Sequence, residues 1–190
     1  EVAKIGETTY PTLNKAIEAV NDGGTITLLK DEIFTVKNRT HNSGTWYDGM
    51  YYIGDKSFTI DLNGKTISHD GAVNDYLLNF KNGGAKANTI TLKNGTINAG
   101  TAAYCALATS SSNAQKITIN TENITFVNNN SSGATLKIRG GTELNVKAAV
   151  FYMHRLSDRF DFINEKERLN YILGSYNGGS NTISINSKLK

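Results

Sequence analysis

Apolar and polar residues alternate in several short stretches of this chain, and three of these stretches share one pattern. In each, two apolar residues stand two positions apart and a third follows five positions later: Ile60, Leu62 and Ile67; Ile90, Leu92 and Ile97; Ile117, Ile119 and Ile124. Strict alternation predicts strands that bury one face. The copies lie about 30 residues apart, and self-similarity over roughly 20–50 residues is typical of stacked-repeat proteins.

The polar turns within these copies leave two interpretations open. Asn-Gly pairs stand at residues 63–64 and 94–95, and Asn-Gly between alternating apolar residues ordinarily predicts a β-hairpin. A further apolar patch at residues 76–80 gives three short strands per repeat, however. We therefore predict that each repeat is one coil of a parallel β-helix, in which the Asn-Gly pair turns a corner without reversing the chain. A β-sandwich is the structural alternative.

A parallel β-helix stacks equivalent residues of successive coils at the spacing of neighbouring strands, about 4.8 Å. Two stacks follow from the alignment of the copies: an interior column of Ile60, Ile90 and Ile117, and a corner stack of Asn63, Asn94 and Thr121.

Residues 12–22 predict an amphipathic helix, because their apolar members fall on one face: Leu13, Ala16, Ile17 and Val20. Thr12 is the expected N-cap and Gly23 the expected stop. A stacked solenoid exposes its apolar interior and an unpaired strand edge at each end. A short helix directly before the first strand is suited to cover such an end.

The segment that contains this helix, VAKIGETTYPTLNKAIEAVNDGGTITLLKD at residues 2–31, resembles the leading segment of right-handed parallel β-helix domains of the pectate-lyase-like group. Such domains occur in bacterial secreted and cell-surface proteins. The shared pattern is a small strand, Tyr-x-Thr-Leu, an amphipathic helix, a glycine and Thr-Ile-x-Leu. The resemblance implies the fold and an extracellular or cell-surface location. It does not imply an enzyme, because this segment also begins modules with no known chemistry.

The whole chain is therefore predicted to be all-β, a single right-handed, single-stranded parallel β-helix domain over residues 1–190. We expect an N-terminal cap at 1–24, coils at 25–149, a helical excursion at 150–178 and a last strand at 179–190. The excursion is predicted from a capping box followed by an apolar stripe near its C-terminal end.

Composition narrows the classes of partner. The chain has 20 Lys and Arg against 17 Asp and Glu, a net charge of +3, with no dense basic run, which argues against nucleic-acid binding. No apolar run approaches the ~18 residues that span a bilayer, so no membrane insertion is expected. The single cysteine, Cys105, lies among small apolar residues and is expected to be buried and inert. Because the chain begins at Glu1, we expect a signal or upstream region to have preceded it.

The sequence offers few candidates for catalysis. Polysaccharide lyases of this fold need an exposed acidic cluster for calcium and a basic residue beside it. Asp61 should point outward, but its expected counterparts in the next coils are Thr91 and Thr118, so no acidic column is predicted. Asp158 and Asp161 suit an ion-pair face of a helix better than a hydrolase pair. We therefore predict no catalytic residue, no metal site and no cofactor.

The densest unusual feature is an aromatic segment at residues 38–55. Its candidate ligand-binding residues are Trp46, Tyr47, Asp48, Tyr51 and Tyr52. Aromatic rings beside polar groups can stack on sugars, with Asp48 accepting hydrogen bonds from hydroxyls. The alternative is that the segment folds over one flank and buries its aromatics as a small satellite core.

These observations favour a non-catalytic extracellular module for surface attachment or for binding a polysaccharide or host-surface glycan, such as an adhesin, stalk or phage attachment domain. Two alternatives remain: a polysaccharide lyase or glycoside hydrolase-like domain, and a structural subunit that self-assembles by end-to-end or lateral packing, since solenoid ends can stack edge to edge.

Overall fold

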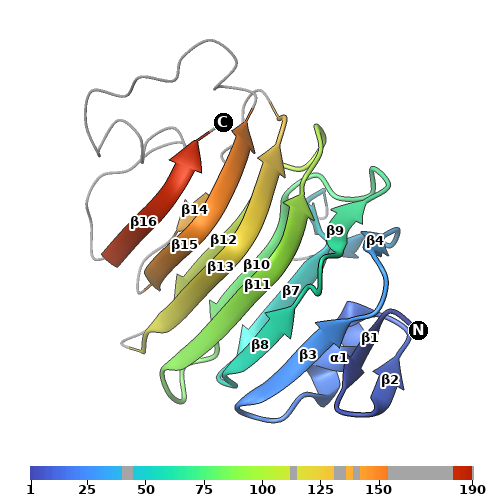
Figure 1. Ribbon diagram of the computed structural model, residues 1–190, viewed down its shortest axis with the longest axis vertical. Helices are drawn as coiled ribbons and strands as arrows, with labels where there is room; N and C mark the ends of the chain where they lie inside the picture. The colour runs from blue at the N-terminus through green and yellow to red at the C-terminus, as the bar shows by residue number, and fades with distance from the viewer. Residues whose placement is uncertain (40–44, 112–114, 131–135, 139–141, 154–181, 190) are drawn as a thin grey trace.

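A computed structural model describes residues 1–39, 45–111, 115–130, 136–138, 142–153 and 182–189. The described chain is mostly β, with one short helix (Figure 1). The elements are β1 (Ala3–Ile5), β2 (Thr8–Tyr10), α1 (Leu13–Ala19), β3 (Gly24–Leu28), β4 (Glu32–Phe34), β5 (Asn38–Arg39), β6 (Tyr47–Asp48), β7 (Met50–Gly54), β8 (Phe58–Asp61), β9 (Thr66–His69), β10 (Tyr76–Asn82), β11 (Asn88–Asn98), β12 (Cys105–Ser111), β13 (Ile117–Asn128), β14 (Leu136–Ile138), β15 (Thr142–Met153) and β16 (Thr182–Leu189).

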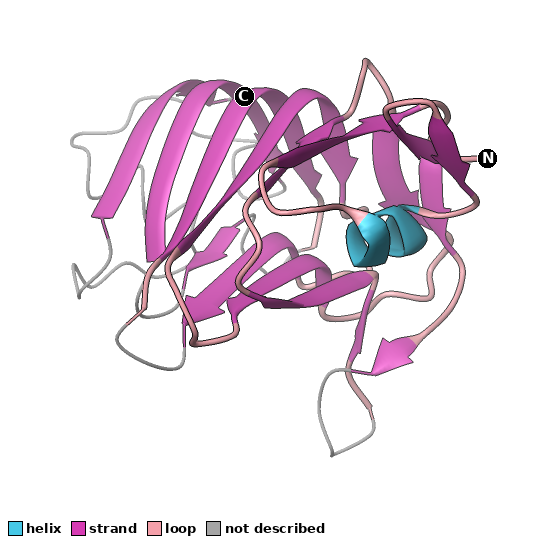
Figure 2. Ribbon diagram, turned by 90° about the horizontal axis from the view of Figure 1, so that it is seen from below, coloured by secondary structure: helices cyan, strands magenta, loops and turns pink. Residues whose placement is uncertain are grey.

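The chain passes back and forth between two sheets. The larger sheet contains β3, β8, β11, β13, β15 and β16 in consecutive parallel pairs, and the smaller sheet has the parallel order β7, β10, β12 and β14. From β7 to β15 the chain visits the two sheets in turn, and each return lies beside the preceding strand of that sheet. Figure 2 shows the two sheets facing each other, with α1 between them at one end.

The Asn-Gly pair after β8 turns a corner, as predicted. Strands β8 and β9 do not pair with each other; both lie parallel to β11, one on each side of the corner. An antiparallel hairpin at this position is therefore excluded. The third apolar patch of the repeat also forms a strand as expected, since it lies in β10 of the smaller sheet.

The interior columns of the larger sheet differ from those predicted. Ile60 lies opposite Leu92, and Leu92 lies opposite Thr121. The predicted column of Ile60, Ile90 and Ile117 is therefore wrong by two residues at each step. Because side chains alternate with a period of two, a slip of two residues leaves each one on the expected face of the sheet. All of these residues are accordingly buried.

The first slip arises at the corner. Beyond it, Ile67 lies opposite Ile97, as the spacing predicts, so the corner between β8 and β9 is two residues longer than the matching part of β11. Leu62, within this longer corner, fills the space next to Gly95. A Cβ at position 95 would lie only 2.4 Å from the Leu62 Cβ, so only glycine fits there. The second slip has no such origin, because Ile90 lies opposite Ile119 before the corner and Ile97 lies opposite Phe126 beyond it.

Asparagines, and not Thr121, form the corner stack. Asn63, Asn94 and Asn123 all have positive φ, at 50°, 61° and 55°, a conformation that asparagine tolerates better than most residues. The Asn123 amide nitrogen donates to Asn94 Oδ1 over 3.4 Å, and the Asn94 nitrogen donates to Asp61 Oδ1 over 3.2 Å. The predicted inclusion of Thr121 is wrong, because the register places it in the interior.

Helix α1 forms where predicted but is shorter. Thr12 Oγ1 accepts a hydrogen bond from Lys15 N over 3.2 Å, which confirms Thr12 as the N-cap. The helix ends at Ala19, with Val20 as the extended C-cap. The prediction that Gly23 stops the helix is therefore wrong: Gly23, with φ of 81°, turns the chain into β3.

Both ends of α1 are fixed to the following segments of the chain by charged side chains, Glu32 and Lys56. The buried Glu32 carboxylate accepts a hydrogen bond from Leu13 N over 2.6 Å, and burial raises the pKa of Glu32. At the other end, Lys56 Nζ donates to the carbonyls of Ile17 and Val20 over 2.9 and 2.8 Å. These bonds satisfy backbone groups that a helix end leaves unpaired.

The N-terminal strands protect only one of the two sheets. β1 pairs antiparallel with β3 and with β2, so the first strand of the larger sheet is covered. In the smaller sheet β7 is the terminal strand and pairs only with β10 among the described strands. Residues of α1 and of β7 line one pocket at this edge, where no further strand is described.

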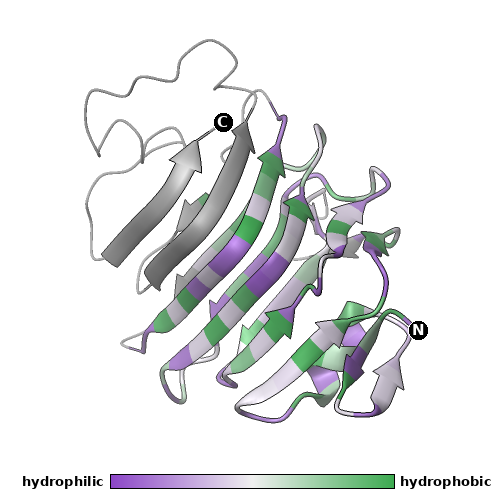
Figure 3. Ribbon diagram, in the orientation of Figure 1, coloured by the Kyte–Doolittle hydropathy of each residue, from purple (hydrophilic) through white to green (hydrophobic). Residues whose placement is uncertain are grey.

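Polar residues line the outward face of the larger sheet and alternate with apolar ones along β11 and β13 (Figure 3). The prediction that Thr91 and Thr118 are the counterparts of Asp61 is wrong. The register pairs Asp61 with Lys93, and Lys93 with Glu122. Lys93 Nζ lies 3.9 Å from Asp61 Oδ2. The row therefore alternates in charge, and cross-strand pairs of opposite charge support a sheet.

The C-terminal part agrees with the prediction only in places. Strand β15 continues to Met153, so the first four residues of the predicted helical excursion are strand. The rest of the excursion, 154–178, lies outside the described residues. Strand β16 falls within the predicted last strand and lies parallel to β15.

Candidate functional site

The five aromatic-segment candidates lie on β6, β7 and the residue before β6, and they do not form one surface. Trp46 precedes β6 and is 47% exposed. Tyr47 is half-buried, with Lys37 Nζ 5.1 Å from the centre of its ring. A cation over an aromatic face at this distance is attracted to it, so Lys37 occupies one face of the Tyr47 ring.

The loop between β9 and β10 holds the backbone of Tyr47. Tyr47 N donates to Asn74 Oδ1 over 2.8 Å, and the Tyr47 carbonyl accepts from the amides of Asn74 and Asp75, both over 3.2 Å. Asn74 Nδ2 also donates to the carbonyl of Thr45 over 2.8 Å. These bonds fix the backbone on both sides of Trp46 while its indole remains half-exposed.

Asp48 has a structural role. Its side chain is fully buried, and its two oxygens accept hydrogen bonds from Tyr76 N over 3.1 Å and Asn79 Nδ2 over 2.8 Å. A buried carboxylate needs such partners. Asp48 therefore joins β6 to β10, and the structure does not present its carboxylate to a ligand.

Tyr51 and Tyr52 project to opposite sides of β7, as neighbouring strand residues do. Tyr52 is 9% exposed, packs edge-on against Phe58 at 5.2 Å between ring centres, and accepts a hydrogen bond from Lys56 N at its hydroxyl over 3.0 Å. Burial raises the pKa of Tyr52. Tyr51 is half-buried, and the adjacent Ile53 is 54% exposed.

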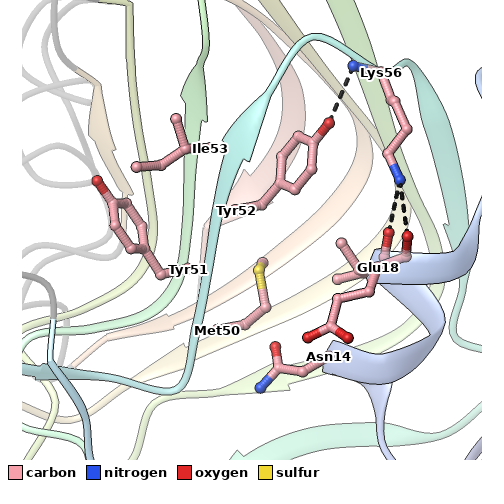
Figure 4. A pocket seen from close by; sticks show the side chains of 8 residues that line it. Asn14, Glu18, Met50, Tyr51, Tyr52, Ile53 and Lys56 are labelled. Carbon is pink, nitrogen blue, oxygen red and sulfur yellow. Dashed lines mark hydrogen bonds between the residues drawn. The ribbon is translucent and has the colours of Figure 1, made fainter.

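A pocket of about 560 Å³ opens between α1 and β7 (Figure 4). One wall consists of β7, with Tyr51, Tyr52 and Ile53. The other wall consists of α1, which contributes Asn14 and Glu18 from the flank of the helix that carries polar residues. A pocket of this size, with mixed apolar and polar walls, is typical of a small-ligand site.

The two charged side chains at this pocket already have partners. Lys56 Nζ donates to carbonyls at the C-terminal end of α1, as the dashed lines in Figure 4 indicate. The Glu18 carboxylate lies 2.8 Å from Lys15 Nζ, one turn earlier on the helix and exposed to solvent. The pocket therefore offers an amide, aromatic and aliphatic surfaces and a paired carboxylate.

The structure thus brings two of the five predicted residues, Tyr51 and Tyr52, into one pocket and leaves Trp46, Tyr47 and Asp48 outside it. Sequence reasoning missed Asn14 and Glu18. The available signal was their spacing of four residues on the polar side of the predicted helix, which aligns them on one flank.

Other polar groups of the described chain support the fold. Asp22 accepts from Ser57 N over 2.7 Å and pairs with Lys86 over 2.8 Å. The Asp55 oxygens accept from the amides of Gly84 and Ala85. The Cys105 side chain is buried, as expected. Within the described residues, no three His, Cys, Asp or Glu side chains lie close enough together to hold a metal ion.

Comparison with known proteins gives no assignment: no family model matches the chain, and neither the curated proteins nor the solved structures contain a significant match. In the described part of the chain, no helix has the length and apolar character needed to cross a membrane.

Proposed function

We propose that this chain is a right-handed parallel β-helix domain of the pectate-lyase-like group and that it serves as a non-catalytic, extracellular or cell-surface module that binds glycans. The alternation of the chain between two parallel sheets supports the fold. The resemblance of residues 2–31 to the leading segment of such domains supports the location. Fold alone does not determine function, so the function rests on the site.

The observation that carries the function is the pocket between α1 and β7. Its lining combines aromatic and aliphatic residues of β7, namely Tyr51, Tyr52 and Ile53, with the amide of Asn14 on α1. Sugars present both an apolar ring face and hydroxyl groups, so they match a wall that stacks and a wall that forms hydrogen bonds. Trp46, half-exposed on a fixed backbone, offers a second contact outside the pocket.

The structural engagement of the carboxylates supports a binding role over a catalytic one. Asp48, Glu32 and Asp55 each accept hydrogen bonds from backbone amides that hold neighbouring segments in place. A general acid or base needs access to substrate, and these groups are committed to the fold. Attachment to a surface needs only the recognition step.

A glycan array with the purified domain tests the proposal, with Tyr51→Ala and Ile53→Ala as pocket variants. Thr59→Ala, which lies outward on β8 of the other sheet, serves as a control. We expect binding to a restricted set of glycans that both pocket variants weaken and the control retains. Incubation of the bound glycans with the protein and calcium should release no unsaturated or reducing ends. Clear turnover would instead establish an enzyme.

A further inference from the structure

The charged residues around the pocket limit the class of glycan that it can bind. Lys56 is the cation that lines it, and an ammonium group has three protons to donate. Lys56 Nζ directs them to three carbonyl oxygens: those of Ile17 at 2.9 Å, Glu18 at 3.4 Å and Val20 at 2.8 Å. A ligand carboxylate could bind Lys56 only by displacing bonds that hold the end of α1.

The acidic group of the pocket also has a partner. Glu18 forms an ion pair with Lys15 over 2.8 Å, and the protons of Lys56 are directed to the carbonyls at the end of α1, so neither cation presents an unused donor to an acidic sugar. A ligand carboxylate entering the pocket would lose hydration without gaining a direct hydrogen bond from a cation, which is costly. It would also approach the Glu18 carboxylate, whose like charge opposes binding.

The remaining surfaces of the pocket suit an uncharged ligand that bears hydroxyl groups. Asn14 offers both a donor and an acceptor, and β7 contributes aromatic and aliphatic residues to the lining, namely Tyr51, Tyr52 and Ile53. We propose that the pocket between α1 and β7 binds neutral saccharides and rejects saccharides that contain uronic acid. This inference rests on the proposed glycan-binding function and specifies the substrate class of the same pocket.

Calorimetric titration with matched disaccharides tests the inference: cellobiose, maltose and chitobiose as neutral probes, and digalacturonate as the acidic probe. We expect at least one neutral probe to bind more than about tenfold more tightly than digalacturonate. Asn14→Ala, which removes a hydrogen-bonding group worth about 1 kcal/mol, should weaken that neutral probe about fivefold. Glu7→Gln, which alters an exposed carboxylate in the turn between β1 and β2, should leave its affinity unchanged.

A charge reversal provides the sharper test. Glu18→Lys places an unpaired cation at the pocket on an exposed helix position where it should not disturb folding. We expect this variant to gain affinity for digalacturonate, by about tenfold at low salt and less at high salt, while its melting temperature stays close to that of the wild type. Glu18→Gln should keep the neutral preference.

The outcomes separate the two proposals. Preference of the wild-type protein for digalacturonate, with a loss on Asn14→Ala, would overturn the neutral specificity and leave the glycan-binding function standing. Binding of a neutral probe that Asn14→Ala and Tyr51→Ala do not weaken would overturn the assignment to this pocket. Binding of no saccharide of either class, here and on the array, would overturn both proposals.

Discussion

Replacing Thr121 by valine should stabilise this protein. Thr121 lies in the interior column of the larger sheet, opposite Leu92, and is 1% exposed. Its hydroxyl has no hydrogen-bond partner in the described part of the chain. Valine has nearly the same shape and exchanges the hydroxyl for a methyl group, so it removes an unsatisfied polar atom without opening a cavity.

The structure sets the expected magnitude. Burying a hydroxyl without a partner costs about 1–3 kcal/mol on the evidence of mutations in proteins. Valine also favours the strand conformation. We therefore expect Thr121→Val to raise the free energy of unfolding by about 1–3 kcal/mol, and the melting temperature by about 2–4 °C per kcal/mol for a chain of this length.

Denaturant titration of three variants separates the hydroxyl from other effects. Thr91→Val makes the same chemical change one strand away, on a half-exposed outward position, and should alter stability by less than about 0.5 kcal/mol. Thr121→Ser keeps the hydroxyl and removes the methyl group, so it should destabilise. If Thr121→Val is neutral or destabilising, the hydroxyl has a partner in solution, and the argument that it is an unsatisfied interior group is refuted.

Three further predictions follow from the packing of the corner and the cap. Gly95→Ala should destabilise by more than about 1 kcal/mol in denaturant melts, because its Cβ would overlap Leu62; wild-type stability would contradict the corner geometry. Glu32→Gln should flatten the pH dependence of stability: with its pKa raised by burial, the folded protein holds a proton that the unfolded chain has released, so the Glu32 contribution declines as pH rises above the ordinary glutamate range. Denaturant melts of the wild type and of Glu32→Gln, from acid to neutral pH, should show the wild type losing more stability as the pH rises. The same pH dependence in both proteins would refute this role of Glu32. Lys56→Met should cost about 1–3 kcal/mol by leaving helix carbonyls unpaired, whereas Lys15→Met, at an exposed ion pair, should cost less than about 0.5 kcal/mol in the same assay.

The faces of the strands could be predicted from the sequence, but the register between them could not. Alternation of apolar residues determines which side chains are buried, and that result is insensitive to a slip of two residues. The shared spacing aligns Ile60, Ile90 and Ile117. At the first step, two additional residues around Leu62 shift the register on one side of the corner only. At the second step, the register is shifted by two residues on both sides of the corner. A spacing rule detects neither shift, because a slip of two residues preserves the alternation of apolar and polar positions.

The site was less predictable than the fold, and the reason lies in the direction of side chains. Proximity in sequence grouped Tyr51 with Tyr52 and Asp48, whereas a strand sends neighbours to opposite sides. Tyr52 consequently packs on Phe58 in the interior, whereas Tyr51 projects from the other face of β7 and is half-buried. The sequence predicts Asp48 as an acceptor for sugar hydroxyls, but its carboxylate is buried and accepts two hydrogen bonds from β10. Such bonds connect positions about 30 residues apart, and no local pattern encodes them.

The pocket and the protection of the sheet edge have one structural cause. The N-terminal segment must cover the first strands of two sheets, and it uses β-structure for one and a helix for the other. Strand β1 pairs with β3 on one side and with β2 on the other, so the three-residue strand β2 forms this edge of the larger sheet. A helix cannot continue a ladder of strand hydrogen bonds, so a pocket remains between α1 and β7. A very short edge strand is a poor template for a further strand, which makes the N-terminal end of this domain better suited to bind a ligand than to extend a fibre.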